Sequence, residues 1–162
     1  MSFQQNNTAI VDLQFVHGNN FQLYAKELVI LKADSISPEY YLFRSPYSLN
    51  ELGGKSSWQT EFNFNNINGL KWEDGHIPYM ELGNILDNLK GFTIVVKGQQ
   101  KLKFLSKFLK ETSIINLDTK CSLKAMKSYI HNCPTHDGDF ERCAVNNVFK
   151  ILIFMEKQEL FQ

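Results

Sequence analysis

The sequence predicts a mixed α/β fold in which a five-stranded mixed sheet is flanked by helices. Three β-rich segments joined by short turns occupy the first 45 residues, a pattern typical of an antiparallel meander. Two short apolar runs then alternate with segments of helical periodicity. A meander that leads into alternating helices and strands adds two parallel strands to the same sheet. The 162 residues suffice for one domain, 1–162, with a hydrophobic core of its own.

The meander is predicted from apolar and β-branched residues. Its three strands span 8–16, 21–33 and 38–45. The first connection, "HGNN" at 17–20, is rich in turn residues, and Pro38 introduces the third strand. Since short connections join antiparallel neighbours, these strands are expected to pair in chain order.

The rest of the chain alternates between helical and strand patterns. Leucine and isoleucine at helical spacing predict a helix within 78–91, which Gly91 ends. The apolar runs 92–98 and 113–117 have the length and composition of buried strands. Asparagines within 56–66 weaken a helical assignment there. The other predicted helices are 48–54, 99–111, 122–130 and a last one from about Phe140 to Met155.

The composition is that of a folded chain without net charge. Hydrophobic residues make up 43% and aromatic residues 13%, which excludes an intrinsically disordered segment. Seventeen basic and seventeen acidic residues cancel, so any nucleic-acid binding requires a local basic patch. No signal-peptide pattern and no apolar run of about 20 residues is present. Together with the odd number of cysteines, this predicts an intracellular protein, cytoplasmic or nuclear, that does not contact a membrane.

Several segments resemble the motifs of one nuclease group. "IVDLQ" carries Asp12 and Gln14 on the first predicted strand, "VVKGQQKLKF" places Lys101 after a later strand, and "HDGDFERCAVNNVF" combines a histidine with a helix start. In this order the chain resembles the ribonuclease H-like superfamily, in its DEDD-type 3'-5' exonuclease branch. That resemblance implies two divalent cations held by four carboxylates. Asp12 matches the first carboxylate, whereas Gln14 and Lys101 stand where two others are expected.

The departures from this pattern predict a catalytically inactive domain. Gln14 offers only a neutral carbonyl, and an ammonium at Lys101 repels a metal ion. The favoured interpretation of Asp12 is therefore a solvated or capped residue at a strand end. The alternative is a divergent nuclease dependent on magnesium or manganese, with Asp12, Asp118 and Glu141 as its carboxylates.

All three cysteines and two of the four histidines lie between Cys121 and Cys143. Cys133 and His136 form a Cys-x-x-His pair, a spacing that lets one turn present two ligands to a tetrahedral zinc. The predicted structural zinc site comprises Cys121, Cys133, His136 and Cys143, with His131 in reserve. The alternative is that the cysteines are small buried apolar residues. A ribonuclease H-like domain with a Cys/His site also resembles the Maelstrom domain of small-RNA pathways.

A basic stretch surrounds the predicted helix 99–111. Such a stretch can bind the phosphates of single-stranded RNA or DNA, or it can be the solvated face of an amphipathic helix. Phe104 and Phe108, at helical spacing, are predicted to lie in the core. The residues predicted to bind nucleic acid are Lys97, Lys101, Lys103 and Lys107.

These observations predict an exonuclease-like pseudoenzyme with a structural zinc. It is expected to act as an RNA-binding or protein-binding module in a nucleic-acid pathway. An adaptor that binds only proteins, through a sheet edge or the loop "WEDGHIPY" at 72–79, is the remaining alternative.

Overall fold

A computed structural model describes residues 7–35, 37–117 and 143–160. Its centre is one five-stranded mixed sheet with the spatial order β3-β2-β1-β4-β5. The predicted sheet of three antiparallel and two parallel strands is thereby confirmed. The strands are β1 (Thr8–His17), β2 (Leu23–Lys32), β3 (Glu39–Leu42), β4 (Thr93–Val96) and β5 (Ile114–Asn116).

The pairing of the strands places β1 at the centre of the sheet. β1 runs antiparallel to β2, with Asp12 opposite Val29 and Gln14 opposite Glu27. On its other edge β1 runs parallel to β4, where Ile10 lies opposite Val95. β2 pairs with β3 in antiparallel and β4 with β5 in parallel orientation. β1 therefore continues past the carboxyl end of β4. Polar side chains on this part of β1 lie where the chain passes between the sheet and its helices.

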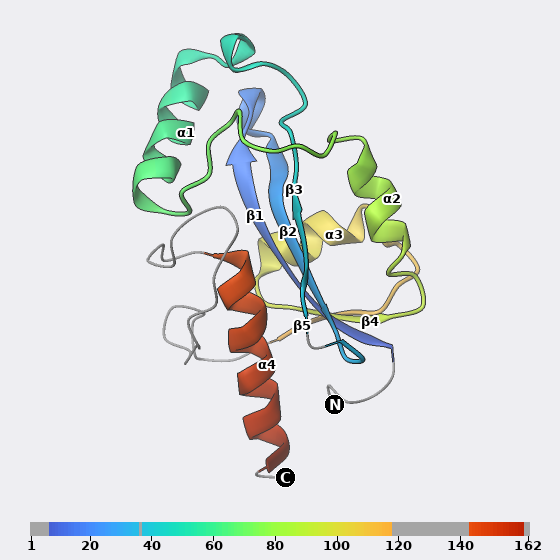
Figure 1. The fold of residues 1–162 in the computed structure, drawn as a ribbon. Coiled ribbons are helices and arrows are strands. Elements are labelled where there is room, and N and C mark those ends of the chain that lie inside the picture. The colour runs from blue at the N-terminus through green and yellow to red at the C-terminus, as the bar shows by residue number, and fades with distance from the viewer. Residues whose placement is uncertain (1–6, 36, 118–142, 161–162) are drawn as a thin grey trace.

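Helices cover both faces of the sheet (Figure 1). Alternate residues of β1 and β2 pack on one face against α2 (Glu81–Asp87) and α3 (Gln99–Ser106). On the opposite face Ile10, Val29 and Val95 pack against α4 (Ala144–Leu160). The alternation follows from the two-residue period of a strand, which sends successive side chains to opposite faces. Each face thus has its own apolar core.

A third, smaller core lies near the connection between β1 and β2. Val16, Leu52 and Trp72 are buried together there, with Tyr24 and Tyr47 packed against them. Trp72 begins the loop 72–79 and its buried ring anchors the loop on the sheet, whereas Glu73 and His76 of the same loop are exposed. α1 (Gly54–Asn66) lies at the same end of the molecule (Figure 1).

Several helix boundaries differ from those predicted. The segment 48–54 forms only a short 3-10 turn, Leu49–Glu51, whereas α1 forms despite its asparagines, because Asn63 is buried and hydrogen-bonds His17. α2 and α3 are shorter than predicted, and α4 extends to Leu160. The predicted helix 122–130 lies outside the described residues. In the part of the chain that the structure describes, no helix combines the length and apolar character that a membrane span requires.

Candidate functional site

Asp12 is buried at the point where the sheet meets two helices. It lies within β1, on the face that α4 covers, and its exposed fraction is 0%. β4 ends at Val96, and Gly98, with φ 129°, turns the chain into α3. Glycine tolerates this positive φ, and its N–H donates to Oδ1 of Asn116 at 3.0 Å. The first turn of α3 is thereby brought beside Asp12.

Three side chains bind the carboxylate of Asp12. Nζ of Lys101 lies 2.5 Å from Oδ1, forming an ion pair. Nδ2 of Asn147, on α4, donates to Oδ2 at 2.9 Å, and Nε2 of Gln14 does so at 3.4 Å. Both carboxylate oxygens therefore have partners inside the protein, as a buried charge requires. We refer to Asp12, Gln14, Lys101 and Asn147 as the Asp12 cluster.

The Asp12 cluster corrects one interpretation made from the sequence. Asp12 was expected to be solvated or capped at a strand end, but it lies within β1 and is fully buried. The side chain of Lys101 is only 14% exposed, because its ammonium is turned inward to neutralise this carboxylate. Lys101 thus supplies the positive charge that an oxygen-rich site otherwise takes from a metal ion.

Asn147 is a member of the cluster that the sequence analysis missed. The carboxylates proposed for the nuclease alternative, Asp118 and Glu141, lie outside the described residues. The helix residue that contacts Asp12 is Asn147, and among the described atoms its Oδ1 is buried without a hydrogen-bond partner. A signal was present, because Asn147 occupies the apolar stripe of α4 that Ala144 and Val148 define.

Glu27 is a second buried carboxylate on the same face of the sheet. Its Oε1 accepts the backbone N–H of Ala144 at 2.9 Å, and its Oε2 accepts the hydroxyl of Tyr40 at 2.8 Å. A carboxylate at the first amide of a helix satisfies an otherwise unpaired donor and interacts favourably with the helix dipole. Glu27 therefore fixes the start of α4 on the sheet, which in turn places Asn147 beside Asp12.

Lys26 is fully buried beside Glu27. The pairing of β1 with β2 shifts at this point, since Gln14 lies opposite Glu27 and Phe15 opposite Ala25, so Lys26 is the extra residue of a β-bulge. Its Nζ donates to Oγ of Ser45 at 3.1 Å, to the carbonyl of Trp72 at 2.6 Å and to the carbonyl of Asp74.

The three acceptors match the three donors of an ammonium group. Burial lowers the pKa of Lys26 to about 8, although the nearby Asp74 and Glu73 oppose this shift. Lys26 consequently links the loop 72–79 to β2 through its hydrogen bonds to two carbonyl groups of the loop.

Only one predicted zinc ligand lies within the described residues. Cys143 is buried at the start of α4, where it packs in the same apolar core as Ile10 and Val95. Cys121, Cys133 and His136 lie outside the described ranges, as does His131. Within 7–35, 37–117 and 143–160, no group of three or more histidine, cysteine, aspartate or glutamate side chains is placed to hold a metal ion. The zinc site stays a prediction.

The four lysines predicted to bind nucleic acid have different surroundings. Lys101 belongs to the Asp12 cluster, and Lys97 is half-buried. Lys103 on α3 and Lys107, the residue that follows the helix, are exposed, and within the described part of the chain neither forms an ion pair. Phe104 is buried as predicted, whereas Phe108 is 37% exposed.

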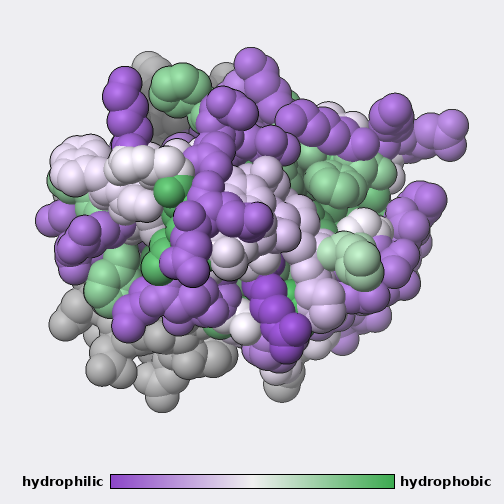
Figure 2. Space-filling model, turned by 90° about the horizontal axis from the view of Figure 1, so that it is seen from above, coloured by the Kyte–Doolittle hydropathy of each residue, from purple (hydrophilic) through white to green (hydrophobic). Residues whose placement is uncertain are grey.

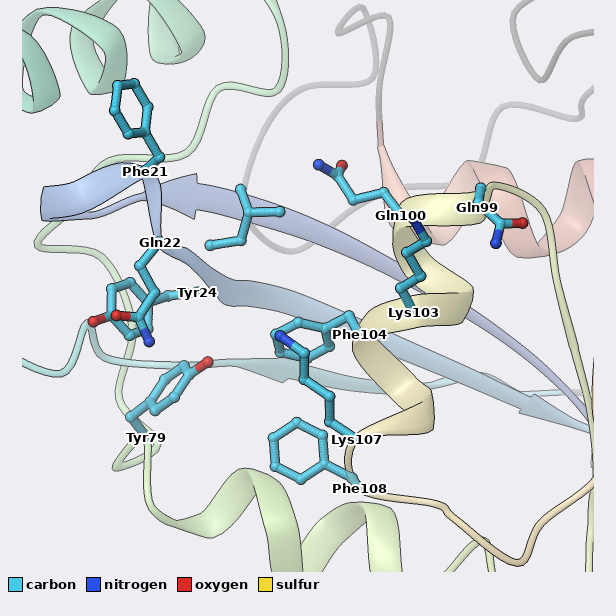
Figure 3. Close-up of a pocket in the computed structure, with 11 residues that line it drawn as sticks. Phe21, Gln22, Tyr24, Tyr79, Gln99, Gln100, Lys103, Phe104, Lys107 and Phe108 are labelled. Atoms are coloured by element: carbon cyan, nitrogen blue, oxygen red, sulfur yellow. The ribbon is translucent and has the colours of Figure 1, made fainter.

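Lys103 and Lys107 border a groove of about 710 Å³ between α3 and the start of β2 (Figure 3). One side consists of residues of α3 and of the turn that follows it, and the other consists of the β1–β2 connection together with Tyr24 and Tyr79 (Figure 3). We call this hollow the α3 groove. Its described lining is Phe21, Gln22, Leu23, Tyr24, Tyr79, Gln99, Gln100, Lys103, Phe104, Lys107 and Phe108.

Two tyrosines that line the α3 groove pack against each other. The rings of Tyr24 and Tyr79 meet edge to face, with centroids 5.5 Å apart, and the hydroxyl of Tyr79 accepts the backbone N–H of Ala25 at 3.2 Å. Burial raises the pKa of Tyr79, so its hydroxyl stays neutral.

Viewed from the end that carries the β1–β2 connection, the surface shows hydrophobic side chains in separate small areas between hydrophilic ones (Figure 2).

Comparison of the chain with protein-family models, with curated proteins and with solved structures gave no match.

Proposed function

We propose that this chain is a catalytically inactive ribonuclease H-like domain that binds single-stranded nucleic acid. The ribonuclease H-like assignment is supported by the sheet order, with the strand that carries Asp12 at the centre of a five-stranded mixed sheet. The lack of activity is supported by the ion pair between Asp12 and Lys101, which is the observation that carries the proposal.

The positive charge of Lys101 in this ion pair opposes metal-dependent nuclease activity. A two-metal nuclease needs several carboxylates that remain free to bind cations. In the Asp12 cluster the carboxylate is bound by an ammonium and by two amide groups. A divalent cation would have to displace Lys101, and the displaced ammonium would remain beside it.

The binding function is supported by two exposed lysines, one on α3 and one directly after it. Lys103 and Lys107 lie one helical turn apart on the rim of the α3 groove. Lysines at this spacing can contact successive phosphates and release their counterions. The α3 groove has no acidic residue among its described lining, so its charge is complementary to a phosphate backbone.

A salt titration tests this function. We would measure the binding of a fluorescent 12-residue single-stranded RNA, with DNA of the same sequence in parallel, from about 50 to about 200 mM salt. Lys103→Glu/Lys107→Glu is expected to weaken binding at least about tenfold. It should also lower the slope of log K against log salt by about 1.4, because two phosphate contacts are lost.

Lys55→Glu/Lys90→Glu is the matched control, since it makes the same charge change at exposed positions of the chain that do not line the α3 groove. Equal losses in both double variants, or no RNA or DNA binding by the unaltered protein, would contradict the binding function. Magnesium- or manganese-dependent cleavage that Asp12→Ala abolishes would establish the nuclease alternative instead.

The proposal includes a structural zinc held by Cys121, Cys133, His136 and Cys143. Zinc bound by such a set stabilises the fold. The burial of Cys143 at the start of α4 fits a site that ties this helix to the preceding segment. Elemental analysis of the purified protein is expected to give nearly one zinc per chain, and Cys133→Ser should abolish it. A stable protein without metal would assign the cysteines to the apolar core.

A further inference from the structure

The connection between β1 and β2 holds a phenylalanine in an unfavourable backbone conformation. Asn20 has φ 59° and ψ 34°, and Phe21 follows with φ 60°. Asparagine tolerates this left-handed region, but for a bulky residue such as phenylalanine it is a rare and costly conformation. Glycine is the usual residue where a hairpin turn requires positive φ.

Neighbouring groups enforce the conformation of this turn. The N–H of Gly18 donates to the carbonyl of Gln22 at 2.8 Å. The backbone N–H of Asn19 donates to the hydroxyl of Tyr47 at 2.8 Å, and its side chain binds the backbones of Glu51 and Gly53. Strain that the surroundings maintain in this way is characteristic of functional positions.

Packing does not account for Phe21. Its side chain is 92% exposed, the highest value among the exposed large hydrophobic residues of the described chain. An exposed ring contributes little to the free energy of folding, because it removes almost no apolar area from water. The protein therefore carries both a strained backbone and a solvated ring at this position.

Phe21 lies on the rim of the α3 groove, across from Lys103 and Lys107 (Figure 3). The amide side chain of Gln22 lies on the same side as Phe21, and that of Gln100 extends from α3 toward this side (Figure 3). Single-strand binding sites combine aromatic rings, on which bases stack, with cations that contact the phosphates. Amide groups can form hydrogen bonds with the edges of unpaired bases.

We propose that Phe21 is a stacking platform for an unpaired base of a single strand whose phosphates Lys103 and Lys107 contact. This inference rests on the proposed nucleic-acid binding and adds the site and the form of the ligand. A paired base has no free face at a protruding ring, so the site selects single strands over duplexes. The strained turn is retained because it holds the ring in solvent at the edge of the α3 groove.

Phe21→Gly separates stacking from stability and from charge. Glycine adopts the positive φ without strain, so we expect the melting temperature to be unchanged or raised. The affinity for the single-stranded 12-mer should fall about tenfold, the lower part of the range for losing one stacked base. The slope against salt should stay unchanged, since no phosphate contact is lost. Phe21→Trp should restore the affinity.

An abasic strand of the same length provides the decisive comparison, because it keeps the phosphates and lacks the bases. Its binding should be the same in Phe21→Gly as in the unaltered protein. Trp58→Ala, which removes a 63% exposed ring on α1, is the control and should bind both strands normally.

The possible failures are distinguishable. Normal binding by Phe21→Gly, with a loss in Lys103→Glu/Lys107→Glu, would overturn the stacking site and leave the proposed function standing. Equal losses on normal and abasic strands would do the same, because stacking requires a base. An unaltered protein that binds no oligonucleotide, but forms a stable complex with another protein, would overturn both proposals.

Discussion

Asp12 and Lys101, 89 residues apart in the chain, form an ion pair 2.5 Å long beneath the helices that cover the sheet. Breaking such a pair by removing one partner leaves an uncompensated buried charge. Asp12→Asn and Lys101→Met are therefore each expected to lower the free energy of unfolding by about 3 kcal/mol. Urea denaturation measures both.

The double variant Asp12→Asn/Lys101→Met should be clearly more stable than the sum of the single effects implies, since it leaves neither charge unpaired. Lys103→Met, on the exposed side of the same helix, is the control and should change the stability by less than about 0.5 kcal/mol. If Asp12→Asn left the stability unchanged, the carboxylate would not depend on Lys101, and a role in binding metal would become the better explanation.

Because Lys26 is buried, we predict that the free energy of unfolding rises with pH. Burial lowers its pKa to about 8 in the folded protein, whereas an unfolded lysine titrates near 10.4. Between these values the unfolded state binds more protons, so the free energy of unfolding increases with pH. The increase is expected to be on the order of 2–3 kcal/mol between pH 8 and 10, measured by urea denaturation.

Lys26→Met should remove this increase, although it also lowers the stability: the carbonyl of Asp74 loses its donor, whereas the carbonyl of Trp72 keeps the hydroxyl of Ser45. Measurements should stop near pH 10, because Tyr41 has the opposite effect above this pH. Burial raises the pKa of Tyr41 to about 12 in the folded protein, whereas an unfolded tyrosine ionises near pH 10. Above pH 10 the folded state therefore binds more protons, and the free energy of unfolding decreases as the pH rises. Parallel curves for the two proteins would show that Lys26 does not cause the pH dependence.

Glu27 is predicted to stabilise the start of α4 through its charge. Glu27→Gln keeps an oxygen for the N–H of Ala144 but loses the negative charge at the helix N-terminus and weakens the hydrogen bond from Tyr40. We expect a loss of about 1–2 kcal/mol in the free energy of unfolding. Amide hydrogen exchange should become faster in the first turn of α4.

Glu39→Gln is the matched control, because Glu39 belongs to a partly exposed pair with Lys32 at 3.2 Å. Such pairs contribute about 0–1 kcal/mol. Equal effects of the two substitutions, or unchanged exchange in α4, would mean that the carboxylate of Glu27 does not hold this helix.

The strands and the class of the fold were predictable because they depend on local patterns. β-branched and apolar runs specify strands, and the short turns of the meander specify antiparallel pairing. The burial of Trp72 and Phe104 was predictable for a similar reason, since large apolar side chains lose most by remaining in water. The helix ends were less predictable, because tertiary contacts decide how far a helix continues.

The candidate site was predictable only in part. Asp12 and Lys101 could be singled out from the sequence, but their direct contact depends on where β4 ends and how Gly98 turns the chain into α3. Asn147 joins them from 135 residues away, because Glu27 fixes the position of α4 on the sheet. No sequence pattern specifies the direction of a side chain across such a separation.

By itself, the sequence determined the mixed sheet, the apolar faces of its helices and the presence of an amide and an ammonium group, not carboxylates, at positions 14 and 101. These properties follow from residue type and local periodicity. Only the tertiary structure decided that Lys101 turns inward while Lys103 and Lys107 face solvent, and that Phe21 stands exposed at a strained turn. The physical reason is that burial, charge pairing and backbone strain depend on neighbours that are distant in the chain.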